Sequence, residues 1–175
     1  RCTAIVELTD EFNFGTALVR QFFCDHCDRL RLARLAASNH KPLADLAKRL
    51  LAEEQVHVEH VDGWIRRLGR GTTESRTHVQ RALDALAPLA PGLFEPVDGE
   101  DALVADGRYP VVGADPFETW AAELRAVAQE AGLTLTLARW APDRRGGRRG
   151  VHSDQLGPLL DEMCEVFRQE PTAAW

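Results

Sequence analysis

The stretch PLADLAKRLLAEEQVHVEHVDGWIRRLG, residues 42–69, decides the fold class of this 175-residue chain. Its apolar residues recur every three or four positions, which is the period of an amphipathic α-helix. Pro42 suits a first helical turn and Gly69 ends a helix, so the pattern predicts one long helix over 42–68. The stripe expected to face inward consists of Leu43, Ala47, Leu50, Glu54, His57, Val61, Ile65 and Leu68.

The residues before this stretch predict a second long helix, over 12–37, with a wide apolar face. Thr9, Asp10 and Asn13 are candidate caps at its start. The break at 38–41 is so short that the two helices are expected to form an antiparallel hairpin.

The residues after it predict three further helices, each with a cap at its start and a helix breaker at its end. The signals are Thr72 or Thr73 with Pro88 and Pro91, Asp115 with Gly132, and Ser153 with Pro171, the last helix covering 154–170. Between them we expect an irregular stretch at 93–114, a short strand at 133–137 and a mobile, solvated basic loop at 144–150. The prediction is an all-α helical bundle.

Composition excludes several classes of protein. With a net charge of −6 and no clustered lysines, the chain is unsuited to binding nucleic acid. No apolar run approaches the roughly 20 residues of a membrane span. Four cysteines fit a reducing compartment, so a cytoplasmic protein is expected. The chain begins at Arg1 and its one methionine is Met163, so we expect that residues upstream are missing.

Glu54 and His57 form a Glu-x-x-His pair, which places both side chains on one face of the helix. Asp25 occupies a core-facing position on the preceding helix. Together they are typical of one half of a di-iron four-helix bundle. Three interpretations stay open: a working metal site, a buried hydrogen-bonded network, which we favour, and plain surface exposure.

Cys24-Asp25-His26-Cys27 is a C-x-x-C in the middle of a predicted helix. Zinc would need two further ligands at matched spacing, which the sequence does not offer. We therefore predict packing cysteines. His26, His40, His78 and His152 show no partner pattern.

Several segments resemble one known family in the order in which they occur. They are VRQF at 19–22, DGWIRRLGRGTTES at 62–75, GVHSDQLG at 150–157, Met163, and the ending with Pro171 and Trp175. This pattern is similar to the structural, C-type subunit of the bacterial phenylacetyl-CoA epoxidase complex, a ring 1,2-monooxygenase. The resemblance covers essentially all of the chain, and members of that family carry further helices before this point.

The resemblance implies a ferritin-like fold, of which residues 1–175 are the C-terminal portion, as a single domain lacking its N-terminal helices. It implies no catalytic and no cofactor-binding residues in this chain, and a di-iron centre in a homologous catalytic partner subunit. A reductase would complete the complex, and phenylacetyl-CoA would bind at the subunit interface. The interface candidates are Trp64, Trp120, Trp140 and Trp175, unless these side chains fill the core.

Two other functions remain open on the sequence. The chain would be a di-iron oxygenase or oxidase in its own right if residues upstream supply the missing ligands. It would be an acyl-CoA-binding module if the arginines of 144–149 bind the CoA phosphates.

Overall fold

The computed structural model describes residues 2–7, 13–141 and 143–173. All regular secondary structure within these residues is helical, which confirms the all-α class. The α-helices are α1 (Ala4–Glu7), α2 (Phe14–Ala36), α3 (Lys41–Gly69), α4 (Thr73–Leu86), α5 (Glu100–Ala105), α6 (Pro116–Glu130), α7 (Leu156–Met163) and α8 (Glu165–Gln169). Two 3₁₀ turns, η1 (Ala90–Phe94) and η2 (Gly147–Arg149), complete the set.

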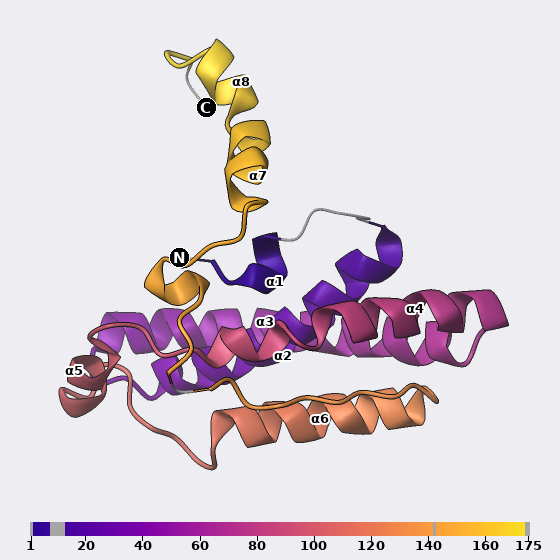
Figure 1. The fold of residues 1–175 in the computed structure, drawn as a ribbon. Helices are drawn as coiled ribbons and strands as arrows, with labels where there is room; N and C mark the ends of the chain where they lie inside the picture. The colour runs from indigo at the N-terminus through magenta and orange to yellow at the C-terminus, as the bar shows by residue number, and fades with distance from the viewer. Residues whose placement is uncertain (1, 8–12, 142, 174–175) are drawn as a thin grey trace.

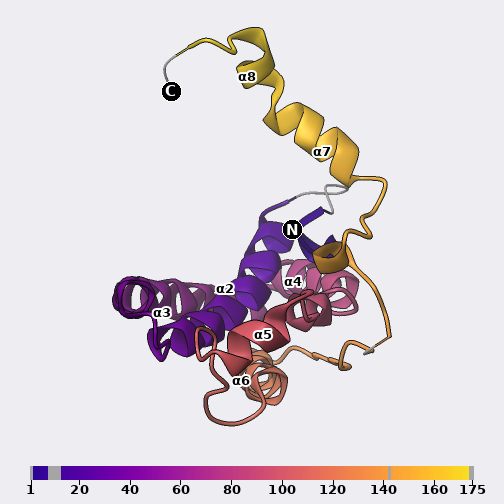
Figure 2. The same cartoon turned by 90° about the vertical axis from the view of Figure 1, so that its left-hand side faces the viewer.

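The long helices α2 and α3 form the expected hairpin, and α4 and α6 each pack against both of them (Figure 1). α2 lies at the centre of the bundle, where it contacts α3, α4, α6 and η1 (Figure 2). One apolar cluster fills the space between these elements, with Phe22, Phe23 and Trp120 fully buried at its middle. The indole N–H of Trp120 donates to the carbonyl oxygen of Phe23 at 3.0 Å. Trp120 therefore fills the core, which is the alternative that the sequence left open for it, and it is not an interface candidate.

The caps that the sequence offered set the starts of the helices. Asn13 accepts a hydrogen bond from the N–H of Thr16 at the start of α2, whereas Thr9 and Asp10 lie outside the described residues. Thr72 caps α4, and Asp115 caps α6 by accepting from two backbone N–H groups. These side chains satisfy donors that a helix start would otherwise leave unpaired.

Gly69 has a packing role at the end of α3. A Cβ atom placed on it would lie 2.5 Å from the carbonyl oxygen of Ala131, at the end of α6. The two helix ends approach so closely that only glycine fits between them. Gly132 ends α6 in the expected way, with a left-handed φ of 69°.

Three expectations about the segments that follow α4 were wrong. The stretch at 93–114 contains the end of η1 and the whole of α5. Leu133 and Leu137 are buried and alternate with exposed threonines, yet residues 133–137 form no strand in the described part of the chain. The predicted helix 154–170 is two short helices that break at Cys164, and Gln155 rather than Ser153 is the residue at its start.

The helices α7 and α8 project from the bundle as an arm (Figures 1 and 2). Neither helix contains a buried residue. No described helix combines the length and the apolar character that a membrane crossing requires.

Candidate functional site

The cluster predicted at Asp25, Glu54 and His57 forms, but at the edge of the hairpin rather than in the core. Oε2 of Glu54 lies 3.0 Å from Nδ1 of His57, and 57% of the His57 side chain is exposed. Leu50, one turn earlier on the same stripe, is 40% exposed. The expectation that His57 and Leu50 face inward is therefore wrong, because α2 covers only the side of this half of α3 on which Ala44 and Ala47 are buried.

Asp25 is the most constrained member of the cluster. Its Oδ2 atom is buried and has no hydrogen-bond partner among the described residues. Burial and the neighbouring Glu54 carboxylate raise its pKa to about 6. A carboxyl group with this pKa takes up a proton readily near neutral pH.

These residues do not fit a di-iron centre by themselves. Bundles of that kind converge two single glutamates and two Glu-x-x-His pairs on one point. Asp25, Glu54 and His57 supply half as many donors, and their donor atoms are not gathered as a metal requires. Among the described residues, a group of three ligand atoms within 4.8 Å of one another occurs only at Cys2, Glu7 and His152, which lie elsewhere in the fold.

A second polar network surrounds His26, and the sequence analysis did not predict it. His26 is buried, and its two ring nitrogens lie 2.9 Å from Asp62 and 3.3 Å from Glu123. Arg29 donates to the same Glu123 carboxylate at 2.7 Å. The network links α2, α3 and α6 at one point. One feature of the sequence could have predicted this network: His26 lies on an apolar line of the helix, and a buried histidine requires a polar partner.

The basic loop at 144–150 is docked on the bundle, so its prediction as a mobile, solvated loop is wrong. Glu95 is 1% exposed and accepts hydrogen bonds from the backbone N–H groups of Gly146 at 2.7 Å and Arg148 at 3.2 Å. A Cβ atom on Gly147 would lie 2.0 Å from the carbonyl oxygen of Cys2. The loop is thus held between η1 and the N-terminal segment.

The base of the projecting arm is fixed by a buried glutamate. Glu7 is fully buried and accepts from Nδ1 of His152 and from the N–H of Ser153, both at 2.7 Å. Burial opposes its ionisation, but these two hydrogen bonds prevail and lower the pKa of Glu7. The contacts join α1 to the segment that leads into α7.

The two cysteines of the C-x-x-C motif pack as predicted. Cys27 is fully buried and Cys24 is half-buried, and neither forms a disulfide. Burial raises the pKa of Cys24 to about 12 and that of Cys27 to about 11. Both thiols are therefore protonated and unreactive at neutral pH.

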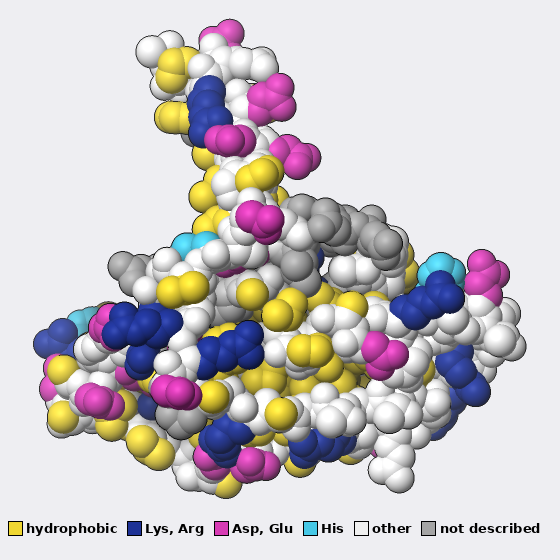
Figure 3. Space-filling model, in the orientation of Figure 1, with side chains coloured by type: hydrophobic (Ala, Val, Ile, Leu, Met, Phe, Trp, Pro, Cys, Tyr) yellow, Lys and Arg dark blue, Asp and Glu magenta, His cyan; other side chains and the backbone are white. Residues whose placement is uncertain are grey.

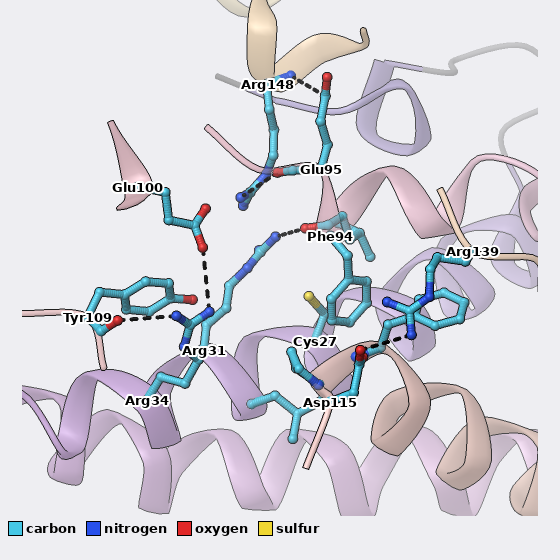
Figure 4. A pocket seen from close by; sticks show the side chains of 14 residues that line it. Cys27, Arg31, Arg34, Phe94, Glu95, Glu100, Tyr109, Asp115, Arg139 and Arg148 are labelled. Carbon is cyan, nitrogen blue, oxygen red and sulfur yellow. Dashed lines mark hydrogen bonds and ion pairs between the residues drawn. The ribbon is translucent and has the colours of Figure 1, made fainter. Parts of the chain in front are cut away.

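Three arginines and a tyrosine gather where α2, α5 and η2 meet, and a fourth arginine lies further along, at the start of α6 (Figure 4). The guanidinium of Arg34 lies 3.6 Å from the centre of the Tyr109 ring. Arg31 and Arg148 line both of two neighbouring cavities, of about 190 and 650 Å³. Arg139 closes the smaller cavity by pairing with Asp115 at 3.0 Å.

Comparison with known proteins places the chain in one family. The family model described as "Phenylacetic acid catabolic protein" matches residues 1–175. The C-type subunit of the 1,2-phenylacetyl-CoA epoxidase of Escherichia coli K12 is 32% identical over 166 residues, which cover 93% of this chain and 64% of that relative. The chain thus spans slightly less than two thirds of the length of this curated relative.

Proposed function

Because this chain belongs to the phenylacetic acid catabolic protein family, whose fold is ferritin-like, we propose that it is the non-catalytic structural subunit of a multicomponent phenylacetyl-CoA epoxidase. In that role it stabilises a homologous catalytic subunit during aerobic phenylacetate degradation. The di-iron centre belongs to the catalytic subunit, and a reductase supplies the electrons. The similarity to the C-type subunit of such an epoxidase supports this assignment.

The observation that carries the proposal is the incomplete polar cluster of the hairpin. An oxygenase must hold its metal ligands to within tenths of an ångström. Here His57 is mostly exposed and its Nδ1 atom is already engaged by Glu54. Asp25 keeps an unpaired buried oxygen. This incomplete set of ligands supports a scaffold role, in which the chain has the fold of a metal-binding bundle but does not bind the metal.

The projecting arm is our candidate for the contact with the catalytic subunit. Leu160, Met163 and Phe167 are 46%, 70% and 56% exposed, and they are spaced three and four positions apart along α7 and α8. Figure 3 shows apolar side chains along this arm, away from the body of the molecule. An unsupported apolar stripe costs free energy in water, which burial against a partner recovers.

A second uncovered surface lies on the first half of α3. Leu46 and Leu50 are 44% and 40% exposed there. We assign this surface to further helices of the same chain, so that residues 1–175 form one ferritin-like domain together with helices that precede them. The length of the E. coli relative, of which the chain covers 64%, supports this assignment. A cytoplasmic location is part of the proposal and fits four free cysteines.

Two of the four tryptophans remain interface candidates on burial. Trp64 is half-buried, where it packs edge-on against Phe14, and Trp140 is half-buried beside the basic loop. Trp175 lies outside the described residues. We place phenylacetyl-CoA near the interface with the catalytic subunit, where both chains line its cleft.

The test measures iron and assembly together. The full-length protein is purified alone and co-expressed with its catalytic homologue, and each sample is analysed by size exclusion and by elemental analysis. We expect a stable complex that contains iron and an isolated scaffold protein that contains none. About two irons per chain in the isolated protein would show a di-iron enzyme instead.

Variants locate the interface. Met163→Asp combined with Phe167→Asp puts two charges on the arm, and we expect loss of co-elution with unchanged helical content by circular dichroism. Val111→Asp is the matched control, because Val111 is 71% exposed but lies away from the arm. Equal loss of assembly in both proteins would reject the arm as the contact.

A further inference from the structure

The larger of the two cavities beside α2 has one apolar and one cationic wall. Its volume of about 650 Å³ lies within the range of ligand pockets in proteins. Two carboxylates also line the cavity, and each pairs with an arginine: Asp98 lies 3.9 Å from Arg149, and Glu100 lies 3.5 Å from Arg34. Leu35, Leu43 and Leu103 line the apolar wall, and Arg31 and Arg148 line the cationic one. These residues come from α2, α3, α5 and η2, so the cavity exists only in the folded bundle.

The positive charges of this cavity differ in how they are balanced. Arg31 pairs with Asp28 at 2.7 Å and donates to the carbonyl oxygen of Leu93. Arg34 pairs with Glu100 at 3.5 Å. No described carboxylate lies within ion-pair distance of the Arg148 guanidinium, which makes one hydrogen bond, of 3.4 Å, to the carbonyl oxygen of Glu95.

Arg148 also lies close to Arg31, as Figure 4 shows. Burial, and next the charge of Arg31, lower the pKa of Arg148. A guanidinium nevertheless keeps its charge in proteins. An anion beside it would relieve the repulsion between two like charges and would satisfy donors that protein groups leave unused.

We propose that this cavity binds a small organic carboxylate, with the carboxylate on Arg148 and the apolar body against Leu35, Leu43 and Leu103. The planar guanidinium accepts a carboxylate through two parallel hydrogen bonds. The apolar wall selects an acid with a hydrocarbon body over a bare inorganic anion. The site goes beyond the scaffold role, because it gives this protein its own small-molecule ligand.

Three probes separate the two walls. Hexanoate has both a charge and an apolar body, hexan-1-ol has only the body, and acetate has only the charge. Binding to the full-length protein is measured by isothermal titration calorimetry, with competition followed by ligand-observed NMR. We expect hexanoate to bind at least about tenfold more tightly than either of the other two, because each lacks one set of contacts.

Variants test the assigned residues. We expect Arg148→Met to weaken hexanoate binding by at least about tenfold, the effect of losing a charge-assisted hydrogen bond. Arg145→Met is the matched control on the same loop, because Arg145 is exposed and lines neither cavity. Leu103→Ser changes a side chain that is 42% exposed, so the fold tolerates it, and it should weaken hexanoate but not acetate.

The proposal is overturned if hexanoate shows no binding up to about 10 mM, a concentration that would reveal even a weak site. It is also overturned if acetate binds as tightly as hexanoate, or if the Arg145 variant loses as much affinity as the Arg148 variant. These assays use the protein without its partner, so their failure is separate from failure of the proposed assembly.

Discussion

Replacing His26 with glutamine removes the cation at the centre of the buried network. His26 is 3% exposed and bridges Asp62 and Glu123. Removing one member of a buried ion pair typically costs about 3–5 kcal/mol. The cost is smaller here because Arg66 lies 3.4 Å from Asp62, and Arg29 donates to Glu123, so neither carboxylate is left alone. We expect a loss of about 2 kcal/mol in the free energy of unfolding at pH 6.

The loss in the free energy of unfolding depends on pH, and the pKa of His26 determines the direction of that dependence. Burial disfavours the charged ring, but the hydrogen bonds to Asp62 and Glu123 outweigh it and raise the pKa of His26 above its ordinary value of 6.5. The stabilisation by the charged ring is therefore complete below about pH 6.5 and is lost as the pH rises through the raised value. The cost of the substitution should fall to about 1 kcal/mol at pH 9.

Urea denaturation of the wild type and the variant at both pH values measures these costs. His78→Gln is the control, since His78 is exposed on α4 and lies outside the His26 network. We expect the control to change the free energy of unfolding by less than about 0.5 kcal/mol at either pH. A cost for the His26 variant that is equal at both pH values would refute a charged His26.

Other substitutions test other parts of the fold. Gly69→Ala should destabilise the protein by at least about 1–3 kcal/mol in urea melts, because the added methyl group meets the end of α6. Gly63→Ala, which meets nothing within 4 Å, should instead stabilise α3 by about 0.5–1 kcal/mol. Asp25→Asn should raise the stability at pH 7 by about 1 kcal/mol, since the raised pKa means that the charge is unfavourable there; equal stability with the wild type would contradict this. Cys24 and Cys27 should react with Ellman's reagent at pH 8 only after unfolding, and rapid labelling of the native protein would refute their burial.

The parts of the fold that depend on local sequence were predictable. The start of α4 follows from Thr72, whose side chain pairs with a backbone N–H three residues later. The start of α6 follows in the same way from Asp115 and Pro116. Both signals act over one helical turn, so no knowledge of the tertiary structure is needed to recognise them.

The side chains that form the networks and the cavity were not predictable, because their partners are distant in sequence. His26 meets Asp62 and Glu123, which lie 36 and 97 positions further along the chain. Arg148 is held beside Glu95 through backbone contacts across 53 positions. A run of arginines predicts a solvated loop, and only the structure shows that the buried Glu95 carboxylate accepts hydrogen bonds from this one.

The stripe on α3 shows the limit of periodicity. The predicted stripe does share one side of the helix, yet Val61 and Ile65 are fully buried while Leu50 and His57 are exposed. The reason is length: α3 has 29 residues, whereas α4 and α6 have 14 and 15 and so cover about half of it. Periodicity reports which residues share a face, and the elements packed on that face determine which part is buried. Glu54 and His57 lie near the middle of this 29-residue helix, at the limit of what helices of 14 and 15 residues can cover, so the same shortfall that exposes Leu50 also leaves the polar cluster incomplete.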